Sequence, residues 1–368
     1  HSPTQIKDFE QYWNQVTPEN AGKWGSVERT RDSYNWGPLD DAYNFAKENG
    51  FPFRFHVLLW GNQQPTWIET LEPSEQLEEI AEWMDTVAAR YPDIDYLEVV
   101  NEPFNDPPNG AGNGNYFNAL GGRGSSGYDW LIEGFRMARE RFPNTKLMMN
   151  EYNVLNNLFQ ASTYVKVVNL LKQEGLIDVI GVQGHAFTTT TGNETMENVL
   201  ESLAQTELPI MVTELDIDGP SDDVQLQSYK RIFPLLWEHP SVIGITLWGF
   251  RPGLWRNEQK AYLIDTDGSE RPALTWLRSY VEQSNASLTL SEENDIRFGI
   301  YPNPADRFVY VNSSSEVVEV VIRDLVGRVL HVSSDAEVAL PASLTTGTYM
   351  VSVKTVSGEI FSRRLKVN

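Results

Sequence analysis

Two glutamates lie at the ends of short apolar runs far apart in the chain. Glu102 closes the run Tyr-Leu-Glu-Val-Val-Asn-Glu at residues 96–102, and Glu214 closes Leu-Pro-Ile-Met-Val-Thr-Glu at residues 208–214. In a barrel of parallel strands, the carboxyl ends of the strands meet at one face. Two carboxyl groups in one pocket there are what cleavage of a glycosidic bond requires. Taken singly, each glutamate could instead cap a strand or pair with an arginine, but the pair favours catalysis.

The elements that position these residues repeat along residues 4–285, where apolar runs alternate with amphipathic stretches. This pattern is typical of strand–helix units around a parallel sheet. Seven strands are predicted, at Trp13–Pro18, Pro52–Trp60, Tyr96–Asn101, Lys146–Asn150, Val179–Gln183, Leu208–Thr213 and Val242–Trp248. Eight helices are predicted, at Thr4–Tyr12, Asp40–Asn49, Ser74–Arg90, Trp130–Arg141, Ser162–Glu174, Thr195–Thr206, Asp222–Glu238 and Arg271–Gln283.

These elements predict an α/β fold, a (β/α)8 TIM barrel that lacks one strand. A closed barrel has no sheet edges, so seven strands would leave two exposed. Because the chain opens on the predicted helix Thr4–Tyr12, we expect the first strand to lie outside residues 1–368. An upstream segment would then supply it, between the strands that end at Pro18 and Trp248. The alternative is that this chain alone builds the barrel, with the gap closed by the N-terminal tail, by distortion or by the C-terminal domain.

The two glutamate segments resemble the signatures of the glycoside hydrolase family 10 endo-β-1,4-xylanases. In that family the acid/base lies in an Asn-Glu-Pro or Asn-Glu-Ala step, and the nucleophile lies in a Thr-Glu-Leu-Asp step. The resemblance runs from about residue 8 to residue 280. It implies a retaining double displacement on xylan or xylo-oligosaccharides, with Glu102 as acid/base, Glu214 as nucleophile, and no metal or cofactor. Retention predicts that the two carboxyl groups lie about 5–5.5 Å apart.

The resemblance also implies a set of sugar-binding residues. Asn101 is expected to bind the sugar 2-hydroxyl, and His185 to hold the nucleophile ionised. Residues 19, 20 and 23 are expected to bind the sugar two positions from the cut on the non-reducing side. The full set is Glu19, Asn20, Lys23, His56, Trp60, Gln63, Asn101, Gln183, His185, Trp248, Trp255 and Arg256. Alone, Pro18-Glu19-Asn20 could be an ordinary turn and His56 a core histidine.

The chain departs from the family pattern at two of these strand ends. Gly61 stands where the family usually has a histidine, and Asn62 is the candidate to replace the lost hydrogen-bonding partner. Glu151 stands where the family commonly has an aspartate. The loop after Glu102, Phe104–Asp129, is rich in Gly, Pro and Asn and is too long for a simple connection. It is therefore expected to shape the leaving-group side.

Composition excludes several classes of function. A formal net charge of −22 over 368 residues argues against a nucleic-acid partner, because phosphate binding needs clustered lysine and arginine. The chain has no cysteine, which excludes disulfides and thiolate metal sites, and its five histidines show no metal-ligand spacing. No stretch approaches about 18 uninterrupted apolar residues, so no membrane insertion is expected.

A second domain is predicted after the barrel. Residues 1–284 are assigned to the barrel, 285–295 to a polar linker without regular structure, and 296–368 to a small β-sandwich. With Tyr-Pro-Asn-Pro at residues 301–304 and Gly-Thr-Tyr-Met-Val at 347–351, the sandwich resembles a type IX secretion C-terminal sorting domain. It would engage the secretion machinery and place the protein outside the cell or on its surface. A carbohydrate-binding sandwich is the alternative.

Three other functions stay open at this point: a related barrel enzyme that cuts another β-linked glucan or mannan, a sugar-binding barrel without catalysis, and a structural cell-surface protein. Release of xylo-oligosaccharides from xylan, but not of glucose oligomers from cellulose, would separate the first of these from a xylanase. Any turnover would exclude the other two.

Overall fold

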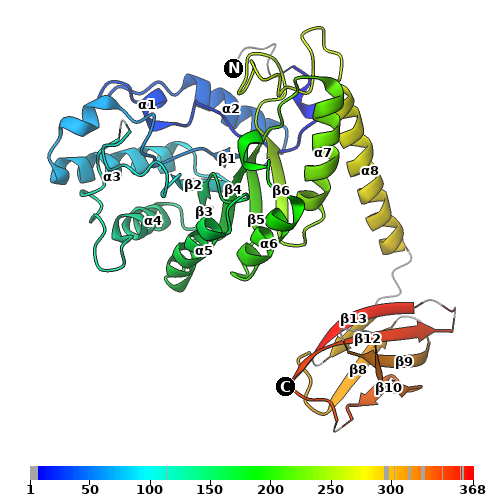
Figure 1. Cartoon of the computed structure of the whole chain (residues 1–368). Coiled ribbons are helices and arrows are strands. Elements are labelled where there is room, and N and C mark those ends of the chain that lie inside the picture. The colour runs from blue at the N-terminus through cyan, green and yellow to red at the C-terminus, as the bar shows by residue number, and fades with distance from the viewer. Residues whose placement is uncertain are drawn as a thin grey trace. The chain divides into compact units, whose positions relative to one another are not determined.

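The computed structural model describes residues 7–112, 114–293, 298–301, 303–313, 316–324, 328–341, 343–356, 358 and 360–368. The chain divides into two compact units, His1–Leu277 and Arg278–Asn368. The first is a β/α barrel in which helices cover a curved sheet of six parallel strands (Figure 1). The strands are β1 (Arg54–Phe55), β2 (Tyr96–Asn101), β3 (Lys146–Glu151), β4 (Val179–Gly184), β5 (Ile210–Leu215) and β6 (Val242–Leu247). The main helices are α2 (Gly37–Glu48), α3 (Pro73–Arg90), α4 (Asp129–Arg141), α5 (Leu158–Gln173), α6 (Asn193–Ala204), α7 (Asp222–Trp237) and α8 (Pro272–Glu293).

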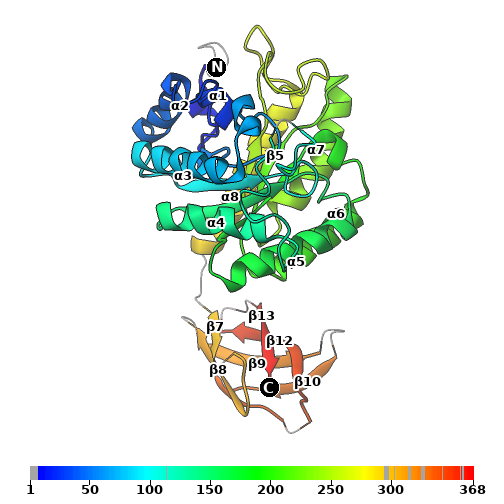
Figure 2. The same ribbon diagram turned by 90° about the vertical axis from the view of Figure 1, so that its left-hand side faces the viewer.

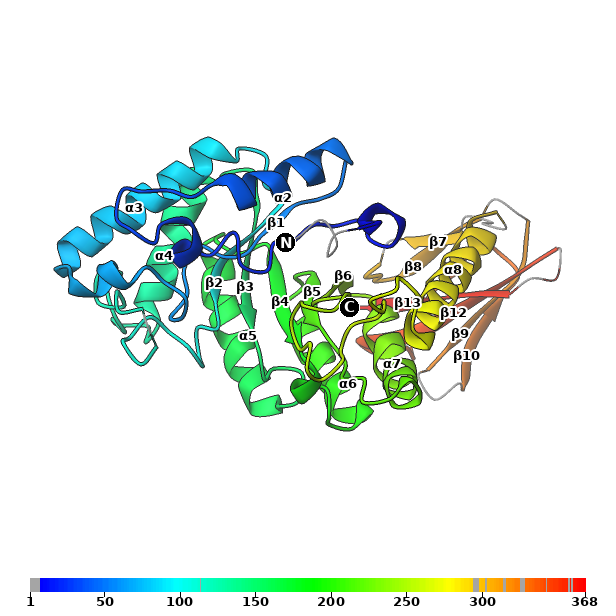
Figure 3. The same cartoon turned by 90° about the horizontal axis from the view of Figure 1, so that it is seen from above.

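The central strands are apolar runs buried on both faces. Every residue of β4 and β5 is buried, as is all of β2 and β3 after the first residue. Such runs are typical of parallel sheets, because helices cover the sheet. Helices α3 to α7 lie on the outer side of the strands (Figures 2 and 3). Since all six strands run the same way, their carboxyl ends open on one face of the barrel.

The first two predicted strands are much shorter than expected. Within Trp13–Pro18 only Val16 forms a β-bridge, with Phe53, and within Pro52–Trp60 the only strand is β1. The N–H groups of residues 58 and 59 still donate to the carbonyls of residues 98 and 99 of β2, at 3.1 and 3.0 Å. The segment therefore stays beside β2, but its ladder is interrupted where the chain bends around His56.

Two predicted helices also differ from the structure. Residues 4–6 of the predicted helix Thr4–Tyr12 lie outside the described residues, and the rest contains only the 3-10 turn Phe9–Gln11. Helix α5 begins at Leu158, four residues before the predicted start at Ser162. The reason is Asn157, whose side chain accepts hydrogen bonds from the N–H groups of residues 159 and 160 and so caps the helix.

Helix α8 continues to Glu293, ten residues beyond its predicted end. The expectation that residues 285–295 lack regular structure was therefore wrong for residues 285–293. The sequence from 273 to 293 contains no glycine or proline to end the helix, and its Ala, Leu and Glu residues have high helix propensity. Among the described residues, no helix is long and apolar enough to cross a membrane.

The barrel sheet is open between β6 and the segment around Val16. In the described sheet, β6 pairs only with β5, and its residues are half-buried or exposed whereas those of β4 and β5 are buried. A cavity of about 400 Å³ lies along this open edge, lined by residues 13–15 on one side and 243–248 on the other. Two buried polar atoms at the cavity, Trp13 Nε1 and Thr246 Oγ1, have no hydrogen-bonding partner.

The second unit is a small antiparallel β-sandwich, as predicted. One sheet has the order β10-β9-β12-β13 and the other β11-β8-β7. Buried Val, Ile and Leu side chains from both sheets form its core, including Val309, Val320 and Val351. The strands are β7 (Phe298–Tyr301), β8 (Phe308–Ser313), β9 (Val317–Arg323), β10 (Val329–Ser333), β11 (Glu337–Ala339), β12 (Gly347–Thr355) and β13 (Ile360–Val367).

Candidate active site

The carboxyl ends of the strands surround a cavity of about 380 Å³. Both catalytic candidates, Glu102 and Glu214, line it. Of the other predicted site residues, all but Arg256 line it as well. The cavity also has three lining residues that were not among the predicted site residues: Asp106, Tyr152 and Phe187.

Glu102 follows β2 in a left-handed backbone conformation, with φ of 54°. Its N–H donates to the carbonyl of Asn150 at 2.8 Å, and its carboxylate accepts from Trp60 Nε1 at 2.8 Å and Gln183 Nε2 at 2.9 Å. Burial raises the pKa of Glu102 to about 8, and the negative charge of Glu214 adds to this increase. At neutral pH this carboxyl group therefore carries a proton that it can donate.

Glu214 is held in the opposite state. Burial alone would raise the pKa of its carboxyl group, but the hydrogen bond and charge of His185 outweigh burial and lower the pKa to about 2. His185 Nε2 lies 3.3 Å from Glu214 Oε2, and His185 Nδ1 pairs with Asp216. Burial also disfavours the charged imidazole, yet these two carboxylates raise the pKa of His185 to about 10. Glu214 is thus an ionised carboxylate beside an imidazolium.

Amide side chains connect the two glutamates. Asn150 Nδ2 donates to Glu214 Oε1 at 2.8 Å and to Asn101 Oδ1 at 3.0 Å. Gln183 Nε2 donates both to Asn101 Oδ1, at 3.2 Å, and to Glu102. Because all of these side chains are buried, the network fixes both carboxylates against the floor of the cavity.

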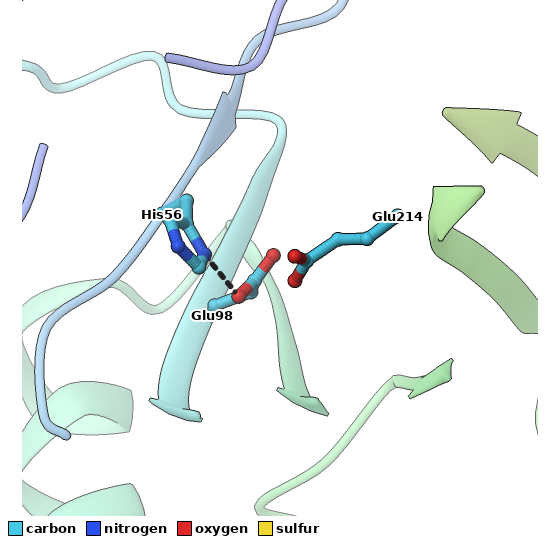
Figure 4. Close-up of side chains that lie close together, drawn as sticks. All are labelled: His56, Glu98 and Glu214. Atoms are coloured by element: carbon cyan, nitrogen blue, oxygen red, sulfur yellow. Dashed lines mark hydrogen bonds and ion pairs between the residues drawn. The ribbon is translucent and has the colours of Figure 1, made fainter. Parts of the chain in front are cut away.

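A third carboxylate, Glu98, lies beneath the pocket and was missed by the sequence analysis. His56 Nδ1 is 2.7 Å from Glu98 Oε2, and both side chains are close to Glu214 (Figure 4). Oxygen and nitrogen atoms of these three residues lie within 4.8 Å of one another, a spacing at which they could hold a metal ion. However, Glu98 already pairs with the fully buried guanidinium of Arg54. The arginine supplies the cation that this cluster of acids needs.

One end of the cavity is formed by the predicted sugar-binding residues that follow Val16. Lys23 Nζ donates to Asn20 Oδ1 at 2.8 Å and to Gln63 Oε1 at 3.1 Å, and it lies 5.2 Å from the centre of the Trp60 ring. Burial lowers the pKa of Lys23. These polar groups converge on the cavity and offer donors and acceptors for sugar hydroxyls.

Aromatic rings form the other walls. Trp248 packs edge-on against His56, and Trp255 is tilted against His185 with ring centres 5.6 Å apart. Trp255 is 41% exposed, which leaves its face available for stacking on a sugar ring. Arg256 lies outside the cavity lining, where its guanidinium pairs with Asp218 at 2.7 Å and lies 3.4 Å from Asp216. It also lies 5.7 Å from the centre of the Phe187 ring, which lines the cavity.

The glycine that replaces the usual family histidine has a structural cause. A Cβ atom on Gly61 would lie 2.1 Å from the carbonyl oxygen of Asp106 and 2.4 Å from that of Pro107. The loop after Glu102 therefore occupies the space that a side chain would need. Asn62, the expected replacement, does not line the cavity, because its amide donates to Asp106 Oδ1 at 2.7 Å. Asp106, and not Asn62, lines the cavity near this position.

Glu151 anchors this loop. Its buried carboxylate accepts from the N–H of Phe104 at 2.9 Å, from Asn105 Nδ2 at 2.8 Å and from the N–H of Tyr152 at 2.8 Å. Burial raises the pKa of Glu151 to about 7. Tyr152 in turn donates its hydroxyl to Asp106 at 3.3 Å. The loop Phe104–Asp129 thus contributes Asp106 directly to the cavity wall.

A β/α barrel with a neutral and an ionised carboxyl group at the carboxyl ends of its strands has the arrangement that glycoside hydrolases of the barrel class use. Residues 1–280 match the family described as Glycosyl hydrolase family 10. The chain belongs to this family.

Similar proteins agree with this assignment. Endo-1,4-beta-xylanase B of Cellvibrio japonicus is 38% identical over 279 residues, which cover 75% of this chain and 44% of that protein. This chain thus spans less than half the length of that relative. Endo-1,4-beta-xylanase 3 of Hypocrea jecorina is 32% identical, with 70% and 73% of the two chains covered. Xylanase 10B of Thermotoga petrophila, solved with xylobiose, has a TM-score of 0.64 and 26% identity over 76% and 90% of the two chains.

The second unit also has known relatives. Residues 299–367 match the family described as Secretion system C-terminal sorting domain. This domain directs the protein to type IX secretion, so the protein is located outside the cell or on its surface.

Proposed function

We propose that the protein is a retaining endo-1,4-β-xylanase that hydrolyses internal bonds of xylan by double displacement. Glu214 attacks the anomeric carbon while Glu102 protonates the departing glycosidic oxygen. Glu102 then removes a proton from water, which attacks the same carbon and releases the sugar from Glu214. Configuration is retained because the carbon is inverted twice.

The observation that carries the proposal is the position of two glutamates in one cavity with opposite surroundings, Glu102 buried beside neutral donors and Glu214 beside His185. His185 keeps Glu214 ionised, and burial keeps Glu102 protonated. In active sites, two carboxyl groups whose surroundings move their pKa values apart typically serve as general acid and as nucleophile. The xylanase relatives support xylan as the substrate. We expect Asn101 to donate through Nδ2 to the sugar 2-hydroxyl, because its Oδ1 already accepts from Asn150 and Gln183.

A reducing-sugar assay across polysaccharides tests the substrate. We expect release of xylo-oligosaccharides from xylan and arabinoxylan and no comparable release from cellulose, β-glucan or mannan. Preferential cleavage of another β-glycan would assign the chain to a related specificity. Absence of turnover on every polysaccharide would point to a sugar-binding barrel.

Substitutions test the two roles separately. Glu214→Ala should abolish turnover on every substrate. Glu102→Ala should abolish cleavage of xylan but spare aryl xylobiosides with good leaving groups, since these need little protonation, and azide should partly restore its turnover. Equal losses of Glu102→Ala on both kinds of substrate would contradict the acid/base role.

We also infer that a further parallel strand from the same polypeptide, outside residues 1–368, fills the open edge beside β6. The edge of β6, the cavity of about 400 Å³ and the unpartnered polar atoms of Trp13 and Thr246 support this inference. Ile243 on β6 is 50% exposed and would be covered by such a strand. A strand in this position would remove both edges of the sheet.

Hydrogen exchange tests the inferred strand. The backbone amides of residues 243–247 that face away from β5 should exchange quickly in a protein of residues 1–368 and slowly in the protein secreted by its native producer. Those of Val242 and Trp248, which already donate to the carbonyls of His239 and Leu215, serve as internal controls. The native protein should also exceed 41.8 kDa, the mass of residues 1–368. Equal exchange in the two proteins would overturn the inference.

A further inference from the structure

Phe159 is the most exposed large hydrophobic side chain described in the structure, at 83%. It lies in the first turn of α5, next to Leu158, which is 49% exposed. Its position is held firmly, because Asn157 Oδ1 accepts from its N–H at 3.1 Å and from the N–H of Gln160 at 3.1 Å. These bonds fix the backbone of the turn, and an exposed aromatic ring beside a second apolar side chain on a fixed backbone indicates an interaction surface.

The first turn of α5 adjoins the wall of the catalytic cavity. Gln160 Nε2 donates to the backbone carbonyl of Tyr152 at 3.2 Å, so the turn that carries Phe159 packs beside Tyr152. Tyr152 lines the cavity together with Phe187, and the two rings meet edge-on with centres 6.4 Å apart. Phe187 is itself 44% exposed. Phe187 and Phe159 are thus two partly or fully exposed aromatic residues on neighbouring strand-end segments, one lining the cavity and one in the turn that packs beside Tyr152.

The order of the strands indicates which half of the substrate meets this wall. Lys23 follows the segment around Val16, which bridges to the residue before β1, whereas Tyr152 follows β3 and Phe187 follows β4. The two groups therefore approach the cavity from different sides of the barrel. If the sugars on the non-reducing side of the cut lie against Lys23, the leaving-group half of the chain passes over Tyr152 and Phe187.

We propose that Phe159 is a stacking platform for a xylose residue in the leaving-group half of a xylan chain, beyond the sugar that contacts Tyr152 and Phe187. The proposal rests on the proposed xylanase function. A xylose ring presents apolar C–H faces, and it can stack on an aromatic ring without a specific hydrogen bond. Phe159 thereby makes the enzyme favour long chains over short ones, with no part in bond cleavage itself.

Substrates of different length test the platform. For Phe159→Ala we expect kcat/KM on xylohexaose and on xylan to fall about three- to tenfold, the range for loss of one aromatic contact. The value on an aryl xylobioside should not change, because its leaving group is too short to reach Phe159. Phe159→Tyr keeps an aromatic face and should retain the preference for long substrates.

A matched control is Phe308→Ala, which removes an exposed phenylalanine from β8 in the sorting domain. Phe308→Ala should change kcat/KM neither on the long substrates nor on the aryl xylobioside. If Phe159→Ala leaves the dependence on chain length unaltered, or lowers kcat/KM equally on long and aryl substrates, the platform is overturned. If the unaltered protein cleaves neither xylan nor aryl xylobioside, the proposed function fails instead.

Discussion

The pH dependence of xylan cleavage should depend on one amide, that of Gln183. Its Nε2 donates to Glu102 Oε1 at 2.9 Å, and this bond favours the ionised form of Glu102 and so lowers its pKa. Gln183→Leu removes the donor while keeping a side chain of similar size. Asn101, the other acceptor of Gln183, keeps its bond from Asn150. The substitution therefore acts mainly on Glu102.

The expected shift can be worked from the bond that is lost. A hydrogen bond to a charged group contributes about 1.5–3 kcal/mol, and one pKa unit corresponds to about 1.36 kcal/mol. The pKa of Glu102 should therefore rise by about 1–2 units in the absence of other donors. Because Trp60 still donates to the other oxygen and water can enter, we expect about 1 unit, from about 8 to about 9.

The assay is the pH profile of kcat/KM on xylo-oligosaccharides between pH 5 and 10. Glu102 must be protonated to act as the acid, so activity falls as pH rises through its pKa, and a higher pKa extends activity to higher pH. The basic limb of the Gln183→Leu profile should move upward even if the maximal rate falls. An unmoved or downward-shifted limb would refute the assignment of this limb to Glu102.

Three further outcomes follow from the structure. Removal of residues 296–368 should change kcat/KM on xylan by no more than about twofold, because this separately folded domain contributes no group to the cavity. A large loss of kcat/KM would indicate that the domain binds substrate or stabilises the barrel. Gly61→Ala should destabilise the barrel by about 1–3 kcal/mol in urea unfolding, because its Cβ would clash with two backbone carbonyls, whereas Gly37→Ala, which meets open space, should cost nothing comparable. The raised pKa of Glu102 means that its contribution to stability is fully present below the unfolded pKa and is lost as pH rises to about 8. The shift from 4.5 to about 8 corresponds to about 5 kcal/mol, so Glu102→Gln should raise Tm at pH 9 by about 5–10 °C more than at pH 4. Equal effects at the two pH values would contradict burial of an ionisable Glu102.

The strand ends could be predicted from sequence because their signal is local. A buried parallel strand is an uninterrupted apolar run, and the polar residue that ends it must face the open end of the barrel. That rule suffices to bring Glu102, Gln183 and Glu214 to one cavity. The β-sandwich was also predictable, because alternating residues and turn signals are local patterns.

The pocket walls were harder to predict. Tyr152 follows the end of β3 by one residue and Phe187 follows the end of β4 by three, so their positions near strand ends could have identified them as lining residues. Asp106 has no such signal, since it reaches the cavity only because the loop after Glu102 folds back over Gly61. Glu98 lies within a strand, and its partner Arg54 comes from another strand, so the pair is visible only in three dimensions.

The residues at the strand ends, and hence the two glutamates and most of the polar groups around them, can be identified from local sequence patterns. Their states of protonation, in contrast, depend on how the strands are assembled. Those states depend on burial and on neighbours such as His185 and Arg54, which come from other strands than Glu214. The position of a residue at the end of a strand specifies the face of the barrel on which its side chain lies. The electrostatic environment of that side chain arises from contacts between elements that are distant in the sequence.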